Sequence, residues 1–167
     1  MEVTGGLQAL AACLRDCLAD KTAVLGIGNP LREDDGIGPY FASLLSPHPN
    51  LLVYDCGQTP ENYAGKVLRE RPRHVILVDA VDFGAAPGEA ALFDAADLHG
   101  SGVSTHTMSL EVFAQALRGA IEDVQVRVLA FQPGARRTGH PVSPQLQRGA
   151  REVAALLSPG GWNDALI

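Results

Sequence analysis

One turn near the start of the chain constrains the fold more than any other feature. The apolar run over residues 23–27 is typical of a buried strand, and Gly26, Gly28 and Asn29 end it. A helix is predicted to follow from about residue 36. A strand that passes through glycines directly into a helix is a βα turn, where open α/β sheets bind their ligands. The chain is therefore predicted to be an α/β protein with its functional site at this turn.

The residues of this turn indicate what kind of ligand it binds. A dinucleotide-binding turn carries a third glycine, and Leu31 stands at that position. Glu33, Asp34 and Asp35 crowd the same turn, and carboxylates repel phosphate and attract cations. We therefore expect a metal ion or a cationic group here. A nucleotide-binding module is a competing hypothesis that rests only on the two glycines.

Composition excludes several classes of protein. The chain has 167 residues, 46% of them hydrophobic and 19% charged, which suits one globular domain with a real core. Its net charge of −6, without a basic block, argues against a nucleic-acid partner. No secretion signal and no apolar run of membrane-spanning length is evident. We expect a cytoplasmic monomer without a membrane partner. Its three cysteines are expected to be thiols that are buried or have no functional role.

The order of predicted elements gives the architecture. Helices are predicted over residues 6–19, 37–45, 61–70, 108–119 and 143–157, and strands over 22–28, 51–55, 74–81, 89–93 and 124–131. The fourth strand follows the third too closely for a helical crossover, so it is predicted to be antiparallel. We expect a three-layer αβα single domain over residues 1–167, with a twisted, mostly parallel five-stranded sheet. Residues 1–20 would add an N-terminal helix, and residues 158–167 a frayed tail.

The topology predicts which residues meet. A central strand order 2-1-3 opens a crevice at the carboxyl ends of the first and third strands. Asp35 follows the first strand and Asp79 ends the third, so both are predicted to face this crevice. His106, just before the helix at 108–119, lies in a loop that returns to the same side of the sheet. Two carboxylates and an imidazole suit a divalent ion such as nickel or zinc, with positions left for substrate or water.

Each of these residues also has an ordinary structural interpretation. Asp34 or Asp35 could be a solvated acid at a helix start, and Asp79 could form a turn at a strand end. His106 could be a common loop histidine. Cys56 could be a nucleophile with His106 as its base, although a small buried thiol at a strand end is the favoured interpretation. From the residues alone, the three-residue site is one hypothesis among these.

Five motifs in order resemble a known family. They are Gly26-Ile-Gly-Asn29-Pro-Leu-x-x-Asp34-Asp35-Gly36-x-Gly38, Asp55-Cys-Gly57-x-x-Pro60-Glu61-Asn62, Val78-Asp79-Ala80-Val-Asp82-Phe-Gly84 with Pro87-Gly88-Glu89, Thr105-His106-Thr-Met108-Ser-Leu110, and Gln132-Pro133. The family is that of the hydrogenase maturation endopeptidases, which process the large subunit of nickel–iron hydrogenases. The resemblance runs from about residue 22 to residue 156. It is strongest to the type serving the formate hydrogenlyase hydrogenase, hydrogenase 3.

The resemblance implies a specific activity and site. It implies a nickel-dependent, aspartic-type peptidase in which Asp35, Asp79 and His106 contact the metal and the two aspartates carry the catalysis. Nickel would be supplied by the substrate, the hydrogenase large-subunit precursor, and other divalent cations could occupy the site. The enzyme would remove a C-terminal extension near the last metal-binding Cys-x-x-Cys motif, which lets the subunit close around its metal centre.

Substrate recognition is implied for the turn after the second strand. The family carboxylate for this role corresponds to Asp55, with Gly57 and Gln58 beside it. The chain departs from the family at Cys56, where a glycine is frequent, in the residues before Lys21, and in the loop over residues 134–140. The side chains of that loop, including Arg136, Arg137 and His140, are interpreted as a solvated basic surface rather than as substrate contacts.

The mechanism can be narrowed by exclusion. Neither Gly-x-Ser-x-Gly nor His-Glu-x-x-His occurs, which removes the signatures of serine hydrolases and zincins. Hydrolysis by an activated water remains, with Asp35 or Asp79 as the general base and the ion favoured as a recognition anchor. A nickel-binding chaperone or checkpoint protein without peptidase activity, using the same ligands, is the competing function.

Overall fold

The sheet follows the predicted topology. The computed structural model describes residues 6–98 and 107–158. Its five strands are β1 (Thr22–Ile27), β2 (Leu51–Gly57), β3 (His74–Ala80), β4 (Ala90–Asp94) and β5 (Gln125–Phe131), in the order β2-β1-β3-β5-β4. β1 pairs in parallel with β2 and β3, β3 pairs in parallel with β5, and β4 is antiparallel to β5. The α/β class, the central order 2-1-3 and the antiparallel fourth strand are confirmed.

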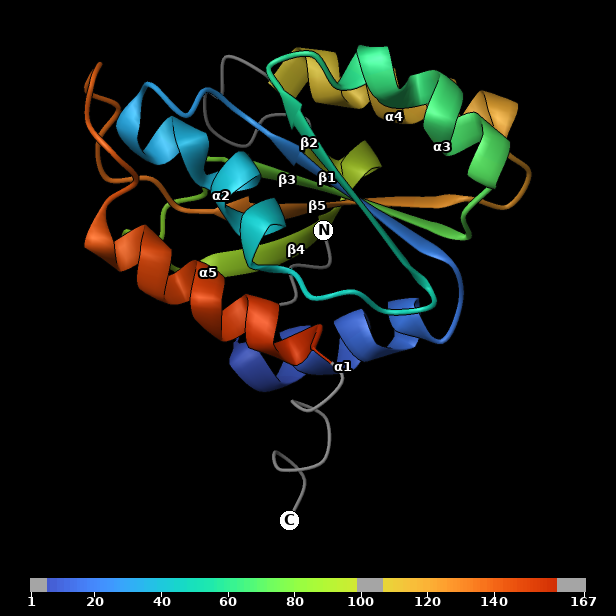
Figure 1. Ribbon diagram of the computed structural model, residues 1–167, viewed down its shortest axis with the longest axis horizontal. Coiled ribbons are helices and arrows are strands. Elements are labelled where there is room, and N and C mark those ends of the chain that lie inside the picture. The colour runs from blue at the N-terminus through green and yellow to red at the C-terminus, as the bar shows by residue number, and fades with distance from the viewer. Residues whose placement is uncertain (1–5, 99–106, 159–167) are drawn as a thin grey trace.

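Helices cover both faces of the sheet. They are α1 (Leu7–Leu18), α2 (Ile37–Leu44), α3 (Ala64–Glu70), α4 (Thr107–Ala120) and α5 (Pro144–Leu156). Three short 3-10 helices were not predicted: η1 (Glu33–Gly36), η2 (Pro60–Tyr63) and η3 (Ala95–Leu98). Figure 1 shows α3 and α4 on one face of the sheet and α1, α2 and α5 on the other. The three-layer αβα arrangement is therefore confirmed.

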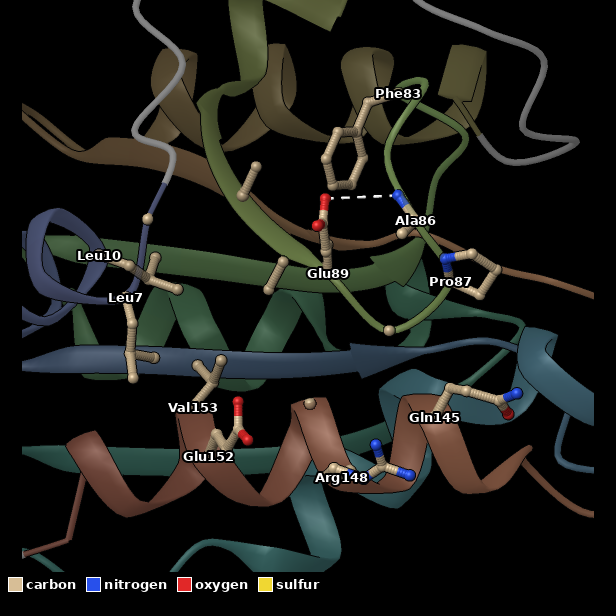
Figure 2. Close-up of a pocket in the computed structure, with 15 residues that line it drawn as sticks. Leu7, Leu10, Phe83, Ala86, Pro87, Glu89, Gln145, Arg148, Glu152 and Val153 are labelled. Atoms are coloured by element: carbon tan, nitrogen blue, oxygen red, sulfur yellow. Dashed lines mark hydrogen bonds between the residues drawn. The ribbon is translucent and has the colours of Figure 1, made fainter.

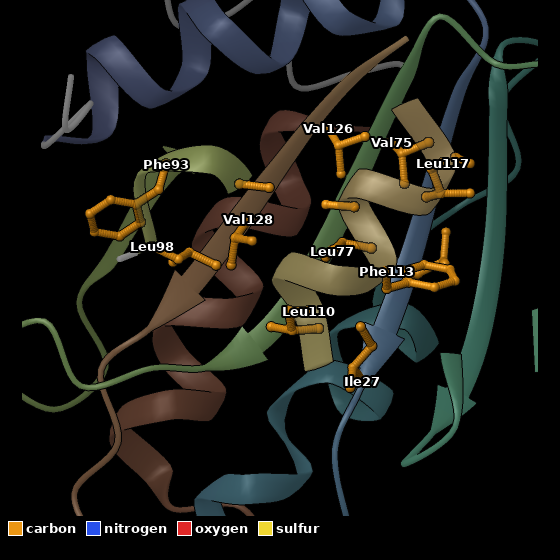
Figure 3. Close-up of a cluster of buried hydrophobic side chains, with 14 of the residues drawn as sticks. Ile27, Val75, Leu77, Phe93, Leu98, Leu110, Phe113, Leu117, Val126 and Val128 are labelled. Atoms are coloured by element: carbon orange, nitrogen blue, oxygen red, sulfur yellow. The ribbon is translucent and has the colours of Figure 1, made fainter. Parts of the chain in front are cut away.

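Two hydrophobic clusters fill the spaces between the layers. Figure 3 shows the cluster under α4, in which Val75 and Leu77 of β3 pack with Leu110 and Phe113. Ile76 and Val78, which follow these two residues along β3, belong to the cluster on the opposite face of the sheet. Because side chains alternate along a strand, Asp79 lies on the same face as Val75 and Leu77, the one that α4 covers.

The predicted N-terminal helix is part of the core. Leu10, Leu14 and Leu18 of α1 are at most 2% exposed and belong to the cluster shared with α5. Cys17 is buried with them. Within the described residues, no helix combines the length and hydrophobicity needed to cross a membrane.

Glycines bring the start of α2 against the sheet. A Cβ atom at Gly38 would lie 2.1 Å from the carbonyl oxygen of Ile27 and 2.6 Å from that of Val78. At Gly28, where φ is +144°, a Cβ atom would lie 1.9 Å from the carbonyl oxygen of Asp35. These glycines therefore serve backbone packing, which fixes η1 over the carboxyl ends of β1 and β3.

This packing makes Gly38 a sensitive position. We expect Gly38→Ala to lower the free energy of unfolding by about 3 kcal/mol, because the carbonyl groups that it would meet belong to fixed strands. The matched change Gly119→Ala, in α4 with no atom within 4 Å of the new Cβ, should instead stabilise the protein by about 0.5–1 kcal/mol. Urea denaturation of both variants measures the difference. A stability of Gly38→Ala equal to that of the wild type would contradict the close packing.

Candidate active site

The three acidic residues of the turn have different environments. Asp34 is fully buried, and its carboxylate accepts three backbone hydrogen bonds. Oδ2 accepts from the N–H groups of Gly134 (2.8 Å) and Ala135 (3.1 Å), and Oδ1 accepts from that of Ser143 (2.9 Å). Ser143 directly precedes α5. Asp34 is therefore a structural clamp that joins the β1–α2 turn to the β5–α5 loop, and its interpretation as a solvated helix-start acid is wrong.

Glu33 is held by a cation of the same chain. Its carboxylate accepts hydrogen bonds from the backbone N–H of Arg137 (3.0 Å), from Nε (3.0 Å) and from Nη2 (2.9 Å). These bonds lower the pKa of Glu33 to about 2. Glu33 also has φ +45°, unusual for a residue other than glycine. The expectation that all three carboxylates attract a ligand is thus wrong for Glu33. Arg137 is exposed, as expected for a solvated basic loop, and it is also the ion-pair partner of Glu33.

Asp35 is the member of the turn that acts on Asp79. It is 3% exposed, so its interpretation as a solvated helix-start acid is also wrong. Its Oδ2 accepts a hydrogen bond from the backbone N–H of Asn29 at 3.2 Å. The negative charge of Asp35 acts on the carboxyl group of Asp79. η1 also contacts β3 directly, so the β1–α2 turn and the end of β3 bring these two aspartates together as predicted.

Asp79 is a buried carboxyl group at the end of β3. Burial raises its pKa well above the usual range, and the charge of Asp35 raises it further. The backbone N–H of Ala80, which donates to Oδ1 at 2.8 Å, and the charge of Arg136 act in the opposite direction. Two carboxylates that repel each other in a buried crevice gain from a cation between them. The chemistry of this pair fits a divalent ion.

The third predicted ligand, His106, lies outside the described residues. Among the described residues, no group of three or more His, Cys, Asp or Glu side chains could hold a metal ion. α4 begins at Thr107, the residue after His106, and covers the face of the sheet on which Asp79 lies. The roles predicted for Asp35, Asp79 and His106 remain predictions.

The predicted recognition residues lie at the end of β2. Asp55 is exposed and pairs in register with Gly26, next to the β1–α2 turn. Its Oδ1 accepts the N–H of Gly57 at 3.2 Å, and the carbonyl of Gly57 accepts the N–H of Gly28 at 2.8 Å. Gln58 is exposed beside them. Asp55 and Gly57 thus belong to the last residues of β2 rather than to the turn after it, and the substrate-binding role of the three residues stays a prediction.

Cys56 does not have the properties of a nucleophile. The side chain is 4% exposed, and burial, followed by the charges of Asp55 and Glu61, raises the pKa of its thiol to about 12. A thiol is nucleophilic as the thiolate, which is scarcely populated at neutral pH with this pKa. The interpretation of Cys56 as a buried strand-end thiol agrees with the structure.

Gln132 is a positioning residue that the sequence indicated only through its motif. Its Oε1 accepts the backbone N–H groups of Phe83 (2.8 Å) and Ala85 (3.2 Å), and its Nε2 donates to Oδ1 of Asp82 (3.1 Å). Gln132 follows β5 and Asp82 follows β3. One side chain therefore fixes the loop that leaves the strand of Asp79.

A separate cavity of about 600 Å³ lies between α1, α5 and the segment over residues 83–91. Figure 2 shows the side chains of Leu7, Leu10, Phe83 and Val153 around it. Neither Asp35 nor Asp79 lines this cavity, so it is distinct from the crevice at the ends of β1 and β3.

The fold and the site define the class of protein first. The sheet is an open α/β sheet with two acidic side chains at the point where the strand order reverses. Proteins of this class bind their ligands at the carboxyl ends of the strands. The sequence profile of the hydrogenase maturation protease family matches residues 39–157. The chain belongs to this family, and it is therefore a hydrolase of the peptidase type.

Individual relatives agree with this assignment. The hydrogenase 3 maturation protease of Escherichia coli K12 is 32% identical over 143 residues, which cover 83% of this chain and 88% of the relative. The crystal structure of the NiFe hydrogenase maturation protease HycI from Thermococcus kodakarensis KOD1 superposes with a TM-score of 0.76 at 30% identity, covering 87% of this chain and 98% of that one. The solution structure of the endopeptidase HycI from Escherichia coli gives a TM-score of 0.73 at 30% identity, covering 82% and 89%.

The ion pair of Glu33 predicts a pH-dependent contribution to stability. The pKa of Glu33 is about 2 in the folded protein, below the ordinary value of 4.5. Its stabilising contribution is therefore present above about pH 4.5 and is lost as the pH falls through about 2. Glu33→Gln should lower Tm at pH 7, and the difference from the wild type should shrink between pH 4.5 and 2. Thermal unfolding across this range measures it.

A matched control comes from an exposed ion pair. Glu70 pairs with Lys21 at 3.2 Å, and both side chains are more than 40% exposed. Exposed pairs contribute little, so Glu70→Gln should leave Tm nearly unchanged at every pH. Equal Tm changes for the two variants at pH 7 would show that the ion pair of Glu33 stabilises the protein no more than an exposed pair does, and would contradict the prediction.

Proposed function

We propose that this protein is an endopeptidase that removes the C-terminal extension of a nickel-loaded hydrogenase large-subunit precursor. The family assignment and the names of the relatives support the substrate class. The structural observation that carries the proposal is the pair formed by Asp35 and the buried Asp79 in the crevice between β1 and β3. This pair is suited to receive a positive centre that arrives with the substrate.

Nickel in the precursor is the recognition signal in this proposal. Asp35, Asp79 and His106 supply three protein ligands, which leaves coordination positions for groups of the precursor. The ion would then bridge enzyme and substrate, and the repulsion between the two carboxylates would be relieved only in the complex with a metal-loaded precursor. Such an arrangement favours the correct substrate over metal-free precursor.

Hydrolysis itself needs a base for water. The buried thiol of Cys56 is not available as a nucleophile. Asp35 and Asp79 are the carboxylates of this site, and either can take this role where it is not fully engaged with the ion. The base takes a proton from water as the water oxygen adds to the scissile carbonyl carbon. The same proton then passes to the departing amine, and the C–N bond breaks.

Substitution of the three ligands tests the site. Asp35→Asn, Asp79→Asn and His106→Ala should each reduce processing of nickel-loaded precursor by roughly 100-fold or more, because both metal contact and general-base catalysis are affected. Circular dichroism should show an intact fold. Asp16→Asn, an exposed change on α1, is the control and should process at the wild-type rate. Full activity in two of the three site variants would refute the assignment.

The order of events can be tested with the precursor. The same enzyme preparation is incubated with metal-free and with nickel-loaded precursor, and release of the C-terminal extension is followed by mass spectrometry. We expect release only from the loaded form. Equal rates would reject nickel as the signal and leave an ordinary sequence-specific endopeptidase. A stable complex without release would instead favour the non-proteolytic checkpoint protein.

Asp55 is predicted to contact the substrate rather than the ion. It is exposed at the end of β2, whereas Asp79 is buried at the end of β3. Asp55→Asn should therefore impair cleavage or shift the cleavage position. The affinity for nickel, measured by calorimetry, should stay within about twofold of the wild-type value, a change in binding free energy well below 1 kcal/mol. A collapse of nickel affinity in this variant would make Asp55 a ligand.

A further inference from the structure

The loop after β5 is held rigidly on both sides of one arginine. The backbone N–H groups of Gly134 and Ala135 donate to Asp34, and the backbone N–H of Arg137 donates to Glu33. The carbonyl of Ala135 also accepts the N–H of Asp34 at 3.2 Å. Arg136 stands between these fixed residues. The two carboxylates next to Asp35 in sequence therefore fix the backbone position of Arg136.

Arg136 lies within electrostatic range of the crevice. Its charge opposes the burial that raises the pKa of Asp79. Gln132 and the backbone of Gly84 lower the pKa of the exposed Asp82, and the charge of Arg136 adds to their effect. The side chain is half-buried, and its Nε–H is buried without a hydrogen-bond acceptor among the described residues.

A buried donor without an acceptor is unfavourable in the free protein, so a ligand that supplies an oxygen atom gains from meeting it. The precursor supplies such oxygens, since every peptide group of its tail carries a carbonyl. We propose that Arg136 is a catalytic residue that donates from its guanidinium to the carbonyl oxygen of the scissile peptide bond and stabilises the oxyanion. This inference rests on the proposed peptidase function and assigns the residue that polarises the substrate.

Addition of water to the scissile carbonyl group requires a hydrogen-bond donor for the oxyanion that forms. When water adds to the carbonyl carbon, the π electron pair moves to the carbonyl oxygen, which becomes negative. That pair returns when the C–N bond breaks, and the amine leaves with the proton taken from water. If nickel anchors the precursor, this oxygen needs another hydrogen-bond donor, and a positively charged one stabilises it most. A half-buried guanidinium on a backbone segment that is already held in place can do so with little reorganisation during the reaction.

Steady-state kinetics with nickel-loaded precursor test the proposal. Arg136→Gln should lower kcat roughly 100-fold with KM within about threefold, because the interaction forms in the transition state. Arg136→Lys, which keeps a charged donor without the planar fork, should retain an intermediate kcat. The matched control is Arg151→Gln, which removes an exposed arginine of α5 whose hydrogen bond within residues 6–98 and 107–158 runs along its own helix to Gln147 at 3.3 Å. It should have the wild-type kcat.

The outcomes separate the inference from the function on which it rests. A loss of kcat in Arg136→Gln, at unchanged Tm and with partial recovery in Arg136→Lys, supports the inference. An unchanged kcat, or a raised KM with unchanged kcat, overturns it while peptidase activity of the wild type upholds the proposed function. A loss of kcat that tracks a loss of Tm in both variants also overturns it. If the wild type fails to release the extension from nickel-loaded precursor, the proposed function itself fails.

Discussion

The carboxylate of Asp34 is the contact on which the site depends. It joins the turn after β1 to the loop after β5 through three backbone hydrogen bonds of 2.8–3.1 Å. A buried carboxylate is unfavourable unless it is hydrogen-bonded, and these three N–H donors satisfy the fully buried side chain. One side chain thereby fixes Asp35 from one direction and Arg136 from the other. The crevice is consequently built from two loops that are far apart in sequence and that adopt their form together.

The architecture could be predicted because it depends on local patterns. Strand β3 is buried along its whole length and reads as an uninterrupted apolar run up to Asp79. The short spacing to β4 was enough to predict an antiparallel strand. The 3-10 turns were missed, since Pro60 and Glu33 begin tight turns whose hydrogen bonds differ from those of an α-helix by a single residue.

The site was predicted less completely, for a physical reason. A sequence shows the charge of Glu33 and Asp34 but not their partners, which lie about 100 positions further along the chain. The acidic turn was therefore predicted to be one ligand site, although Asp35 alone of its three acidic residues acts on Asp79. The proximity of Asp35 and Asp79 was predictable from topology, because strand order alone brings the ends of β1 and β3 together. The ion pair that Glu33 makes with the exposed Arg137 could not be predicted for the same reason.

The long sequence separation within the clamp also governs when the crevice can form. The β1–α2 turn leaves the ribosome long before Gly134, Ala135 and Ser143, which complete the hydrogen bonds of Asp34. Contacts between distant residues must await synthesis of the later partner. A nascent chain that ends before β5 thus has both aspartates but lacks the N–H donors that hold Asp34, so a truncated translation product would lack an ordered β1–α2 turn.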